Sequence, residues 1–415
     1  MKIAVLWYGK EWQSTYAWLL KNWYKKEQID ILDKSISDDY LQNLEKYDII
    51  YKTPWISIYL PELQKIKEKI KTQADILFDN FKWKLILISG SKWKSTTSTL
   101  IYTILKNAWK KVKLVGNIWN PILSEVDFDD QPNYIVFEIS SYMLDSTYNV
   151  WSTYSILTNI YNVHTSWHNG HENYINSKLK IFNKTKEAIL RKDVYENLNF
   201  NFKSEVILFW EWTSFNFDYK FISWPTYKLE IDKIKLGWEH NYLNIASILP
   251  ICQLENISQD VIEDTLINFN WLEHRQEFVG EFDEIKYYND SIATIPESVL
   301  QALNRFWDEI DTIILWWKDD DYDYSQVIKI INSLNMQNII LLPDSLDKQK
   351  VGFRKKNIFE VKNMEEAVQI SKEKTKIWKI CILSPGAPSY NLFKNFEERG
   401  KLFKKYVKWV INFDK

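Results

Sequence analysis

The sequence predicts an α/β protein built on parallel sheets. Short, nearly continuous apolar runs such as Lys2–Leu6 and Lys84–Ser89 are typical of buried parallel strands, and patterns with helical spacing follow several of them. The chain has 415 residues, which is too many for one hydrophobic core, so we expect two or three domains.

The composition excludes several classes of protein. A net charge of −2 and a pI near 6.3 give no basic surface for nucleic acid. Cys252 and Cys381 are far apart in sequence and exclude a disulfide framework, which favours a reducing, cytoplasmic setting. No apolar run approaches the roughly 20 residues that cross a bilayer, and the first residues turn polar too early for a signal peptide.

A loop in the first quarter of the chain predicts a phosphate site. The strand Lys84–Ser89 precedes it, and a helical pattern follows it to about Ala108. The loop residues are Gly90, Ser91, Lys92, Trp93, Lys94, Ser95 and Thr96. In such a loop backbone N–H groups and the helix N-terminus face an anion, the lysine reaches the outer phosphates, and the hydroxyl holds Mg²⁺. Trp93 does not fit, because this kind of loop has glycine before the lysine, where the backbone touches phosphate.

Tryptophan is unusually common in this chain and glycine unusually rare. There are 21 Trp and 9 Gly, whereas a typical chain of this length has about 29 Gly. Many tryptophans lie in turns and tight approaches that call for a residue without Cβ. Besides Trp93, those we single out are Trp7, Trp12, Trp55, Trp119, Trp210, Trp212, Trp316 and Trp317.

Our hypothesis is that most of these tryptophans are glycines in the natural protein. UGA codons would then have been translated as Trp although the source lineage reads them as Gly. The alternative is a genuinely Trp-rich protein with a damaged nucleotide site, and UGG codons at Trp93 and Trp119 would support it. Trp409, in an amphipathic helix, fits a genuine tryptophan, and Trp167 fits either interpretation.

Residues 1–80 alternate strands and helices, as in a small parallel α/β unit. The expected strands are Lys2–Leu6, Ile29–Leu32 and Asp48–Tyr51, and the expected helices are Gln13–Lys25 and Pro61–Lys71. With glycine at positions 7 and 12, the first turn would read Gly-x-Gly-x-x-Gly, a nucleotide-binding fingerprint. An ordinary tight turn is an equal alternative.

Residues 81–273 carry the phosphate loop and further motifs. The expected strands are Lys111–Val115, Tyr134–Ile139 and Tyr154–Asn159, and the expected helices are Glu172–Leu190, Glu239–Cys252 and Gln259–Phe269. Glu138 lies at the end of an apolar strand, at the edge where α/β sheets bind ligands. The five histidines, at 164, 168, 171, 240 and 274, fall in loops or helix starts, which favours ligand or solvent contact. A lone loop histidine is, however, more often an ordinary surface residue.

Residues 274–415 form a second α/β unit. Its expected strands are Ile285–Tyr288, Thr312–Leu315, Asn338–Leu341 and Ile380–Leu383. It contains the sequence Asn289-Asp290-Ser291 and, after the last strand, the polar run Ser384–Gly400.

Taken in order, the motifs of this chain resemble those of the Mur ligase family over nearly its whole length. In the first half the resembling segments are Gly90–Thr96, Val115–Trp119, Glu138–Ser141, Val163–His168 and Tyr174–Phe182. In the second half they are Gly237–Asn244, Phe269–Glu277, Asn289–Thr294 and Ser384–Gly400. The last segment most favours the family members that add D-glutamate.

The resemblance implies three domains and a reaction. The domains are a Rossmann-like UDP-sugar-binding domain at 1–80, a P-loop ATPase-like central domain at 81–273, and a Rossmann-like amino-acid-binding domain at 274–415. In the reaction, ATP phosphorylates the carboxylate of UDP-N-acetylmuramoyl-L-alanine, and the amine of D-glutamate attacks the acyl phosphate to give the amide of a peptidoglycan precursor. The implied cofactors are ATP and Mg²⁺. The implied protein is a cytoplasmic monomer that binds these two substrates and neither nucleic acid nor membrane.

The resemblance also assigns roles to single residues. Lys94 would neutralise the β- and γ-phosphates, Ser95 and Glu138 would hold one Mg²⁺, and His164 would hold a second metal or the acyl oxygen. Lys178 would be carbamylated by CO₂ and join the metal ligands as a carboxylate, because an ammonium of pKa about 10.4 repels metal; without the family it reads as a helix-surface lysine. The implied adenosine contacts are Asn241, Arg275 and Asp290, the UDP-sugar contacts Thr53 and Asn117, and the D-glutamate contacts Thr294, Ser389 and Phe396.

Three positions depart from the family pattern. Val163 replaces an aspartate, and Ile292 and Asp320 replace lysines, with Lys318 two residues before the second. Losing two cations beside a dianionic amino acid should weaken its binding. A sibling ligase that adds another amino acid is therefore one alternative. A non-catalytic nucleotide-binding remnant is another, since the indole of Trp93 would fill the space that phosphates need.

Overall fold

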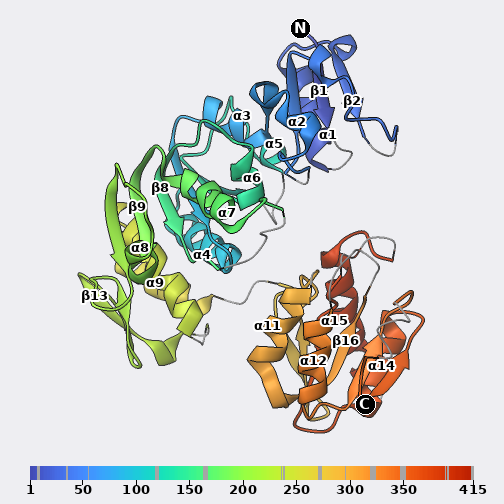
Figure 1. The fold of residues 1–415 in the computed structure, drawn as a ribbon. Coiled ribbons are helices and arrows are strands. Elements are labelled where there is room, and N and C mark those ends of the chain that lie inside the picture. The colour runs from blue at the N-terminus through green and yellow to red at the C-terminus, as the bar shows by residue number, and fades with distance from the viewer. Residues whose placement is uncertain are drawn as a thin grey trace. The chain divides into compact units, whose positions relative to one another are not determined.

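The computed structural model describes residues 1–6, 10–33, 36–54, 56–116, 121–161, 167–234, 236, 239–269, 273–294, 296–317, 324–345, 352–387, 389 and 392–412. The chain divides into two compact units, Met1–Asn270 and Trp271–Lys415 (Figure 1). The first unit contains separate sheets, and its division into two domains stays a prediction. Among the helices of the described residues, none is both long and apolar enough to traverse a bilayer.

The first sheet of the first unit has four parallel strands in the order β2-β1-β3-β4. Its strands are β1 (Ile3–Leu6), β2 (Ile29–Leu32), β3 (Ile49–Lys52) and β4 (Ile70–Lys71), and the helices of this part are α1 (Lys10–Lys21), α2 (Pro61–Gln64) and α3 (Gln73–Asn80). Because β1 and β3 are paired and parallel, their carboxyl ends lie together at one edge, where Thr53 follows β3.

The central sheet has six parallel strands in the order β10-β9-β8-β5-β7-β6. Its strands are β5 (Lys84–Ser89), β6 (Val112–Gly116), β7 (Tyr134–Glu138), β8 (Ser152–Leu157), β9 (Thr185–Arg191) and β10 (Glu205–Phe209). The associated helices are α4 (Lys94–Asn107), α5 (Ile122–Glu125), α6 (Ser141–Asp145), α7 (His171–Leu179), α8 (Lys192–Glu196), α9 (Glu239–Leu254) and α10 (Gln259–Asn268). A small antiparallel sheet follows, formed by β11 (Asn216–Phe217), β12 (Phe221–Trp224) and β13 (Tyr227–Glu230).

The apolar run of β5 is explained by burial on both of its faces. Leu85 and Leu87 pack into a core cluster shared with residues of α3, α6 and α7. Ile86 and Ile88 alternate with them, point to the other face of the sheet and are also fully buried. The strand therefore lies in the middle of the sheet, between β7 and β8, and its carboxyl end meets that of β7, with Ile88 paired to Glu138.

The second unit holds a six-stranded sheet in the order β14-β15-β19-β16-β17-β18, parallel except for the edge strand β14. Its strands are β14 (Glu277–Phe282), β15 (Ile285–Asn289), β16 (Ile310–Leu315), β17 (Asn338–Leu341), β18 (Asn357–Glu360) and β19 (Ile380–Leu383). Its helices are α11 (Pro296–Phe306), α12 (Ser325–Ser333), α14 (Met364–Lys374) and α15 (Phe396–Asn412). Two core clusters, one containing α11 and α12 and one containing α14 and α15, cover the two faces of this sheet.

The α/β class and most predicted strands are confirmed, and two predicted helices are wrong in part. The segment expected as Glu172–Leu190 is α-helical only to Leu179, continues as a short 3-10 helix over Lys180–Phe182, and becomes β9 at Thr185. The apolar residues Ala188–Leu190 are fully buried in β9, since the sheet offers this run two faces to pack on. Likewise the expected helix Pro61–Lys71 stops at Gln64, and Ile70 pairs in β4.

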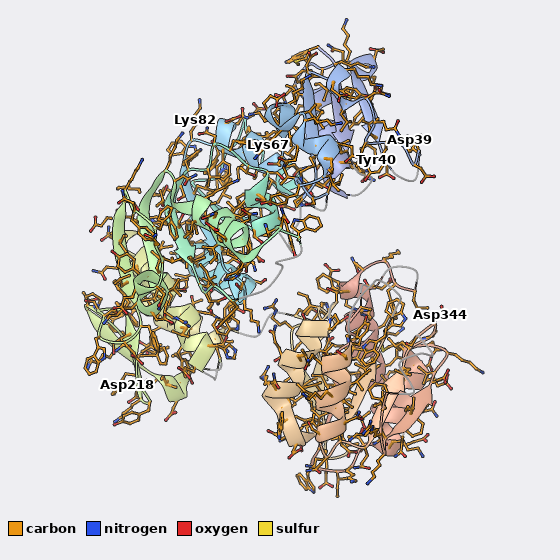
Figure 2. All side chains as sticks on the ribbon, in the orientation of Figure 1. Asp39, Tyr40, Lys67, Lys82, Asp218 and Asp344 are labelled. Carbon is orange, nitrogen blue, oxygen red and sulfur yellow. The ribbon has the colours of Figure 1, made fainter. Side chains whose placement is uncertain are left out.

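Charged side chains mark the outer surface of both units (Figure 2). Asp39, Lys82 and Asp218, labelled there, are all exposed. The chemistry-bearing residues considered next are, in contrast, mostly buried at sheet edges.

Candidate active site

The phosphate loop between β5 and α4 is held by the residues that follow β8. Gly90 has φ +152°, and a Cβ there would lie 1.9 Å from the Thr158 hydroxyl, so only glycine fits. The backbone N–H of Lys92 donates to Asn159 Oδ1 at 2.9 Å, and the Thr158 hydroxyl donates to the Lys92 carbonyl at 2.8 Å. The loop conformation is thus set by the neighbouring strand.

Trp93 is the N-cap residue of α4 and lies in the left-handed region, with φ 68° and ψ 2°. Its indole stacks on the His240 ring at 5.4 Å and meets the edge of Tyr161 at 6.2 Å. The side chain therefore lies beside the start of α4, where the helix dipole and free N–H groups favour an anion.

Two lysines converge on one carbonyl group of this loop. The ammonium groups of Lys94 and Lys178 both donate to the Gly90 carbonyl oxygen, at 2.9 and 2.8 Å. Lys178 is only 2% exposed, and its burial, together with the charge of Lys94, lowers the pKa of its amine well below the ordinary value. This environment favours the neutral amine of Lys178 and favours an anion beside Lys94.

Glu138, the last residue of β7, is fully buried and accepts a hydrogen bond from the Ser95 hydroxyl at 3.2 Å. A carboxylate beside a hydroxyl offers the oxygen ligands that Mg²⁺ prefers. Within the described ranges no cluster of three or more His, Cys, Asp or Glu side chains could hold a metal. His164 and Asn117, both predicted site residues, lie outside the described residues.

Asn241 and Thr53 lie in different parts of the first unit, at the start of α9 and after β3. Asn241 is fully buried in the first turn of α9, next to His240, which stacks on Trp93. The Thr53 hydroxyl is buried and has no hydrogen-bond partner among the described residues, as expected for a group that awaits a ligand. The loop after β3 is held by Lys52, whose ammonium donates to the carbonyls of Thr53 and Ile56 at 2.8 and 2.7 Å.

In the second unit, Asp290 follows β15 at the carboxyl edge of the sheet. Its carboxylate accepts from the Ser384 hydroxyl at 2.8 Å and from the Gln276 backbone N–H at 3.2 Å. Burial raises the pKa of Asp290 to about 7, and these hydrogen bonds and Arg275 only partly oppose the increase.

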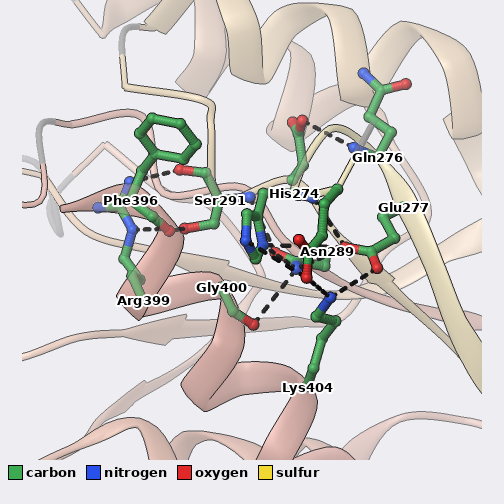
Figure 3. A network of polar contacts seen from close by, with 11 residues as sticks. His274, Gln276, Glu277, Asn289, Ser291, Phe396, Arg399, Gly400 and Lys404 are labelled. Atoms are coloured by element: carbon green, nitrogen blue, oxygen red, sulfur yellow. Dashed lines mark hydrogen bonds and ion pairs between the residues drawn. The ribbon is translucent and has the colours of Figure 1, made fainter. Parts of the chain in front are cut away.

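A buried guanidinium ties together three segments at this edge (Figure 3). Arg399, fully buried in α15, donates to the Ser291 hydroxyl and carbonyl at 3.0 and 2.7 Å and to the Ala387 carbonyl at 3.0 Å. The Ser291 hydroxyl in turn donates to the Phe396 carbonyl at 2.8 Å. Ala387 lies two residues before the buried Ser389.

His274 completes the same network (Figure 3). Its Nδ1 atom lies 2.9 Å from the Asn289 amide nitrogen, and Lys404 donates to Glu277 at 2.9 Å nearby. Gly400 leaves room for the imidazole, since a Cβ on Gly400 would lie 2.2 Å from His274 Nδ1.

A family model described as the Mur ligase middle domain matches residues 88–246. A UDP-N-acetylmuramoylalanine–D-glutamate ligase of Clostridium tetani is 31% identical over 398 residues, covering 90% of this chain and 85% of that protein. One of Aquifex aeolicus is 31% identical over 374 residues, covering 88% of each chain. The chain belongs to the Mur ligase family.

Solved Mur ligase structures share its fold. The UDP-N-acetylmuramate–alanine ligase of Thermotoga maritima aligns over 100% of both chains with a TM-score of 0.59 at 13% identity. A MurF ligase of the same organism, solved in complex with ADP, covers 91% of this chain and 92% of its own with a TM-score of 0.57 at 12% identity. The match to whole ligases agrees with a multi-domain α/β fold.

The structure of this Mur ligase brings most of the predicted residues that it describes into two groups, with Thr53 in neither. The loop Gly90–Thr96 gathers with Glu138, Lys178 and Asn241 in the first unit. In the second unit Arg275 and Asp290 lie near Ser389 and Phe396, and Thr294 follows Ala293, whose carbonyl accepts from Gly386 at 2.8 Å.

Sequence reasoning missed the residues that hold these groups in place, chiefly Thr158, Asn159 and Arg399. Arg399 lies in the polar run Ser384–Gly400, which the sequence singled out without assigning it a role. Thr158 and Asn159 follow a buried strand, and that position at a sheet edge is the signal that could have found them.

Proposed function

We propose that this chain is an ATP-dependent ligase that joins D-glutamate to UDP-N-acetylmuramoyl-L-alanine through an acyl phosphate, in peptidoglycan precursor synthesis. The supporting observation is the identity of about 30% along about 90% of the chain to proteins that carry that name. The reaction brings together a carboxylate, a triphosphate and an amino acid dianion, so neutralising and positioning negative charge should carry most of the catalysis.

In this proposal the first unit binds ATP and the carboxylate to be activated. The loop Gly90–Thr96 and the start of α4 would cradle the phosphates, with Lys94 neutralising the outer ones. Lys94 already lies 2.9 Å from the Gly90 carbonyl, so its ammonium is held at the mouth of the loop. Thr53 and Asn117 would contact the UDP-sugar, and the unpartnered Thr53 hydroxyl supports a polar ligand there.

Ser95 and Glu138 fit one Mg²⁺, because both present oxygen and Glu138 is shielded from solvent. When bound, the ion would offset phosphate charge during transfer. Lys178 fits a metal only as a carbamate, and His164 would complete the ligands. The lowered pKa of Lys178 supports this modification, since a neutral amine is the form that attacks CO₂.

In this proposal Asn241, Arg275 and Asp290 contact the adenosine end, and Thr294, Ser389 and Phe396 bind the amino acid. Ser389 and Phe396 belong to segments that Arg399 joins, so the second unit would present one preformed face to D-glutamate. We also infer that the enzyme works as a cytoplasmic monomer without nucleic acid or membrane partners.

The amino acid is tested by phosphate release from ATP with UDP-N-acetylmuramoyl-L-alanine and a panel of D- and L-amino acids. D-glutamate should support turnover, and L-lysine or a diamino acid should not. Turnover with a diamino acid and not with D-glutamate would make the chain a sibling ligase, as Ile292 and Asp320 allow. No turnover with any amino acid by the Trp93→Gly variant would favour a nucleotide-binding remnant.

The phosphate loop is tested by ATP affinity. A Trp93→Gly variant should bind ATP more tightly than the chain with tryptophan, because the indole lies beside the helix start. Equal affinities would contradict the placement of phosphate in this loop.

A further inference from the structure

His168 is a buried histidine that the proposed reaction does not use directly. It lies four residues after His164 and is fully buried. Its Nε2 atom is 3.0 Å from the Ser141 hydroxyl, and its Nδ1 atom is 3.2 Å from Asp145 Oδ2, without the geometry of a hydrogen bond. The imidazole thus bridges the two ends of helix α6.

Aromatic rings fix the plane of this imidazole. The Tyr142 ring stacks parallel to it at 5.5 Å with an interplanar angle of 3°, and the Tyr174 ring meets it edge-on at 5.4 Å. The Asn173 side-chain amide donates to the His168 carbonyl at 2.9 Å. Contacts on all these sides leave the side chain few alternative orientations.

The residues that His168 joins connect to the proposed metal ligands through the backbone of β7 and α7. Ser141 lies three residues after Glu138, and its carbonyl accepts from the Ser177 hydroxyl at 2.7 Å, next to Lys178. Asp145 also accepts from the Tyr59 hydroxyl at 3.1 Å, which links the cluster to the loop between β3 and α2. One cluster therefore connects the strand end that carries Glu138 with the helix that carries Lys178.

We propose that His168, together with Asp145 and Ser141, is a positioning residue that sets Glu138 and Lys178 at the spacing needed to hold a divalent cation. This inference rests on the proposed function. Partners behind metal ligands commonly change metal affinity about 10- to 100-fold when they are removed.

The test measures Mn²⁺ binding in the presence of ADP by electron paramagnetic resonance, without amino acid substrate and in the Trp93→Gly background, because the indole lies beside the proposed phosphate loop. His168→Ala should raise the dissociation constant of Mn²⁺ at least about 10-fold, and His168→Gln, which keeps an amide near Ser141, should recover part of the loss. The matched control is His171→Ala, an exposed histidine three residues later, which should leave Mn²⁺ affinity unchanged.

A second readout separates positioning from general structure. The KM for D-glutamate should stay within about 2-fold in His168→Gln, because the predicted D-glutamate contacts lie in the other unit. Unchanged Mn²⁺ affinity in a folded His168→Ala protein would overturn the proposal. If that variant does not fold, Asp145→Asn takes its place with the same expected loss. Because the binding assay needs no amino acid, its result stands even if D-glutamate proves to be the wrong substrate.

A separate observation concerns the tryptophans. Seven of them have backbone φ between 39° and 79°, in the left-handed region, and they are Trp23, Trp93, Trp109, Trp210, Trp212, Trp307 and Trp378. Only a few per cent of non-glycine residues adopt such angles, and bulky side chains do so rarely. Glycine adopts them without strain.

Three helix ends show what these positions require. After α9, the N–H of Ile257 donates to the Cys252 carbonyl at 2.9 Å around Asn256, a residue common at such ends. The same bond closes α4 around Trp109, from Lys110 to Leu105 at 3.0 Å, and closes α1 around Trp23, from Tyr24 to Leu19 at 3.1 Å.

The indoles at these helix ends contribute almost no packing. Trp23 is 93% exposed and Trp109 is 95% exposed. Trp151, by contrast, donates its indole N–H to the Phe78 carbonyl at 2.7 Å and stacks on Phe81, and Trp224 is buried in β12. Trp23 and Trp109 thus combine left-handed φ with almost no packing, whereas Trp151 and Trp224 pack against the fold without left-handed φ.

The geometry points to glycine at positions 23, 93, 109, 210, 212, 307 and 378 of the natural protein, and to genuine tryptophan at 151 and 224. Trp12, Trp316 and Trp317, also expected from the sequence to be glycine, do not have left-handed φ. Trp316 and Trp317 are fully buried, and Trp316 donates its indole N–H to the Pro343 carbonyl at 2.7 Å, so the criterion applied to Trp151 places them with the packed tryptophans. Trp7, Trp55 and Trp119 lie outside the described residues.

Peptide masses of the protein from its source organism test this assignment. Peptides spanning positions 93 and 109 should carry the mass of glycine, and the peptide spanning 151 the mass of tryptophan. Tryptophan at both 93 and 109 would overturn it. In recombinant protein Trp109→Gly should raise the Tm by about 3 °C, whereas Trp151→Gly should lower it. A lower Tm for Trp109→Gly would also contradict the assignment.

Discussion

The carboxyl edges of the two large sheets hold basic side chains in opposite ways. At the central sheet, the half-buried Lys94 and the buried Lys178 share the Gly90 carbonyl as an acceptor. At the sheet of the second unit, the Arg399 guanidinium donates to a hydroxyl and two carbonyls from separate segments. A bound anion would stabilise the two lysines at the first edge. The hydrogen bonds of the Arg399 guanidinium at the second edge are already made and hold its loops in place. The difference supports the proposal that the first edge binds phosphate and that the second is preformed for a smaller ligand.

The largest effect should come from the phosphate-binding edge. In the Trp93→Gly background, Lys94→Met removes the charge that would neutralise the outer phosphates, and kcat should fall on the order of 10³-fold. The control is Lys92→Met in the same background. Its kcat should stay within about 3-fold of that of the Trp93→Gly protein, because the Lys92 ammonium lies over the Tyr161 ring. Phosphate release measures both. Equal decreases in kcat for the two variants would mean that Lys94 has no special role among the lysines of this loop.

At the second edge the effect should be on stability first. Arg399→Met leaves the buried carbonyls of Ser291 and Ala387 without their donor, and should lower the free energy of unfolding by about 3 kcal/mol. Urea denaturation measures this change, and Arg354→Met, at an exposed arginine, serves as the control. An unaltered unfolding midpoint for Arg399→Met would show that the three segments are held by other contacts.

Asp290, at the second edge, should make the stability of the protein depend on pH. Its pKa is raised from 3.8 to about 7, so the folded state binds a proton that the unfolded state has released, and its contribution to stability is lost as pH rises from about 4 to 7. Asp290→Asn removes this loss and should stabilise the protein at pH 8 by about 2 kcal/mol, with no gain at pH 4. Urea denaturation at both pH values tests the sign. If Asp290→Asn stabilised the protein at pH 4 and not at pH 8, the pKa of Asp290 would not be raised in the folded protein.

The smallest expected effect comes from steric crowding between residue 400 and the His274 imidazole. Gly400→Ala would place a Cβ 2.2 Å from His274 Nδ1 and should destabilise the protein by about 1–2 kcal/mol through a shifted imidazole. Differential scanning calorimetry of Gly400→Ala, His274→Ser and the double variant measures the coupling. Strictly additive changes would mean that the two residues do not compete for this space.

Much of the fold could be predicted because its signals are local. The run Lys84–Ser89 is apolar throughout because both faces of β5 are buried, and the small residues after it mark the loop. The segment 180–191 could not be assigned in this way. A lysine-rich helical pattern and a buried strand share its composition, and only pairing with β8 decides for the strand.

By itself the sequence determined the α/β class, the phosphate loop, the order of the motifs and the excess of tryptophan over glycine. These depend on residue types at fixed spacing, which need no partner from elsewhere in the chain. Only the tertiary structure decided that Lys94 and Lys178 share one carbonyl, that Arg399 joins three segments, and which tryptophans have left-handed φ. Contacts between residues dozens of positions apart, and the backbone angles they enforce, depend on how the sheets pair and pack, and no local pattern encodes that.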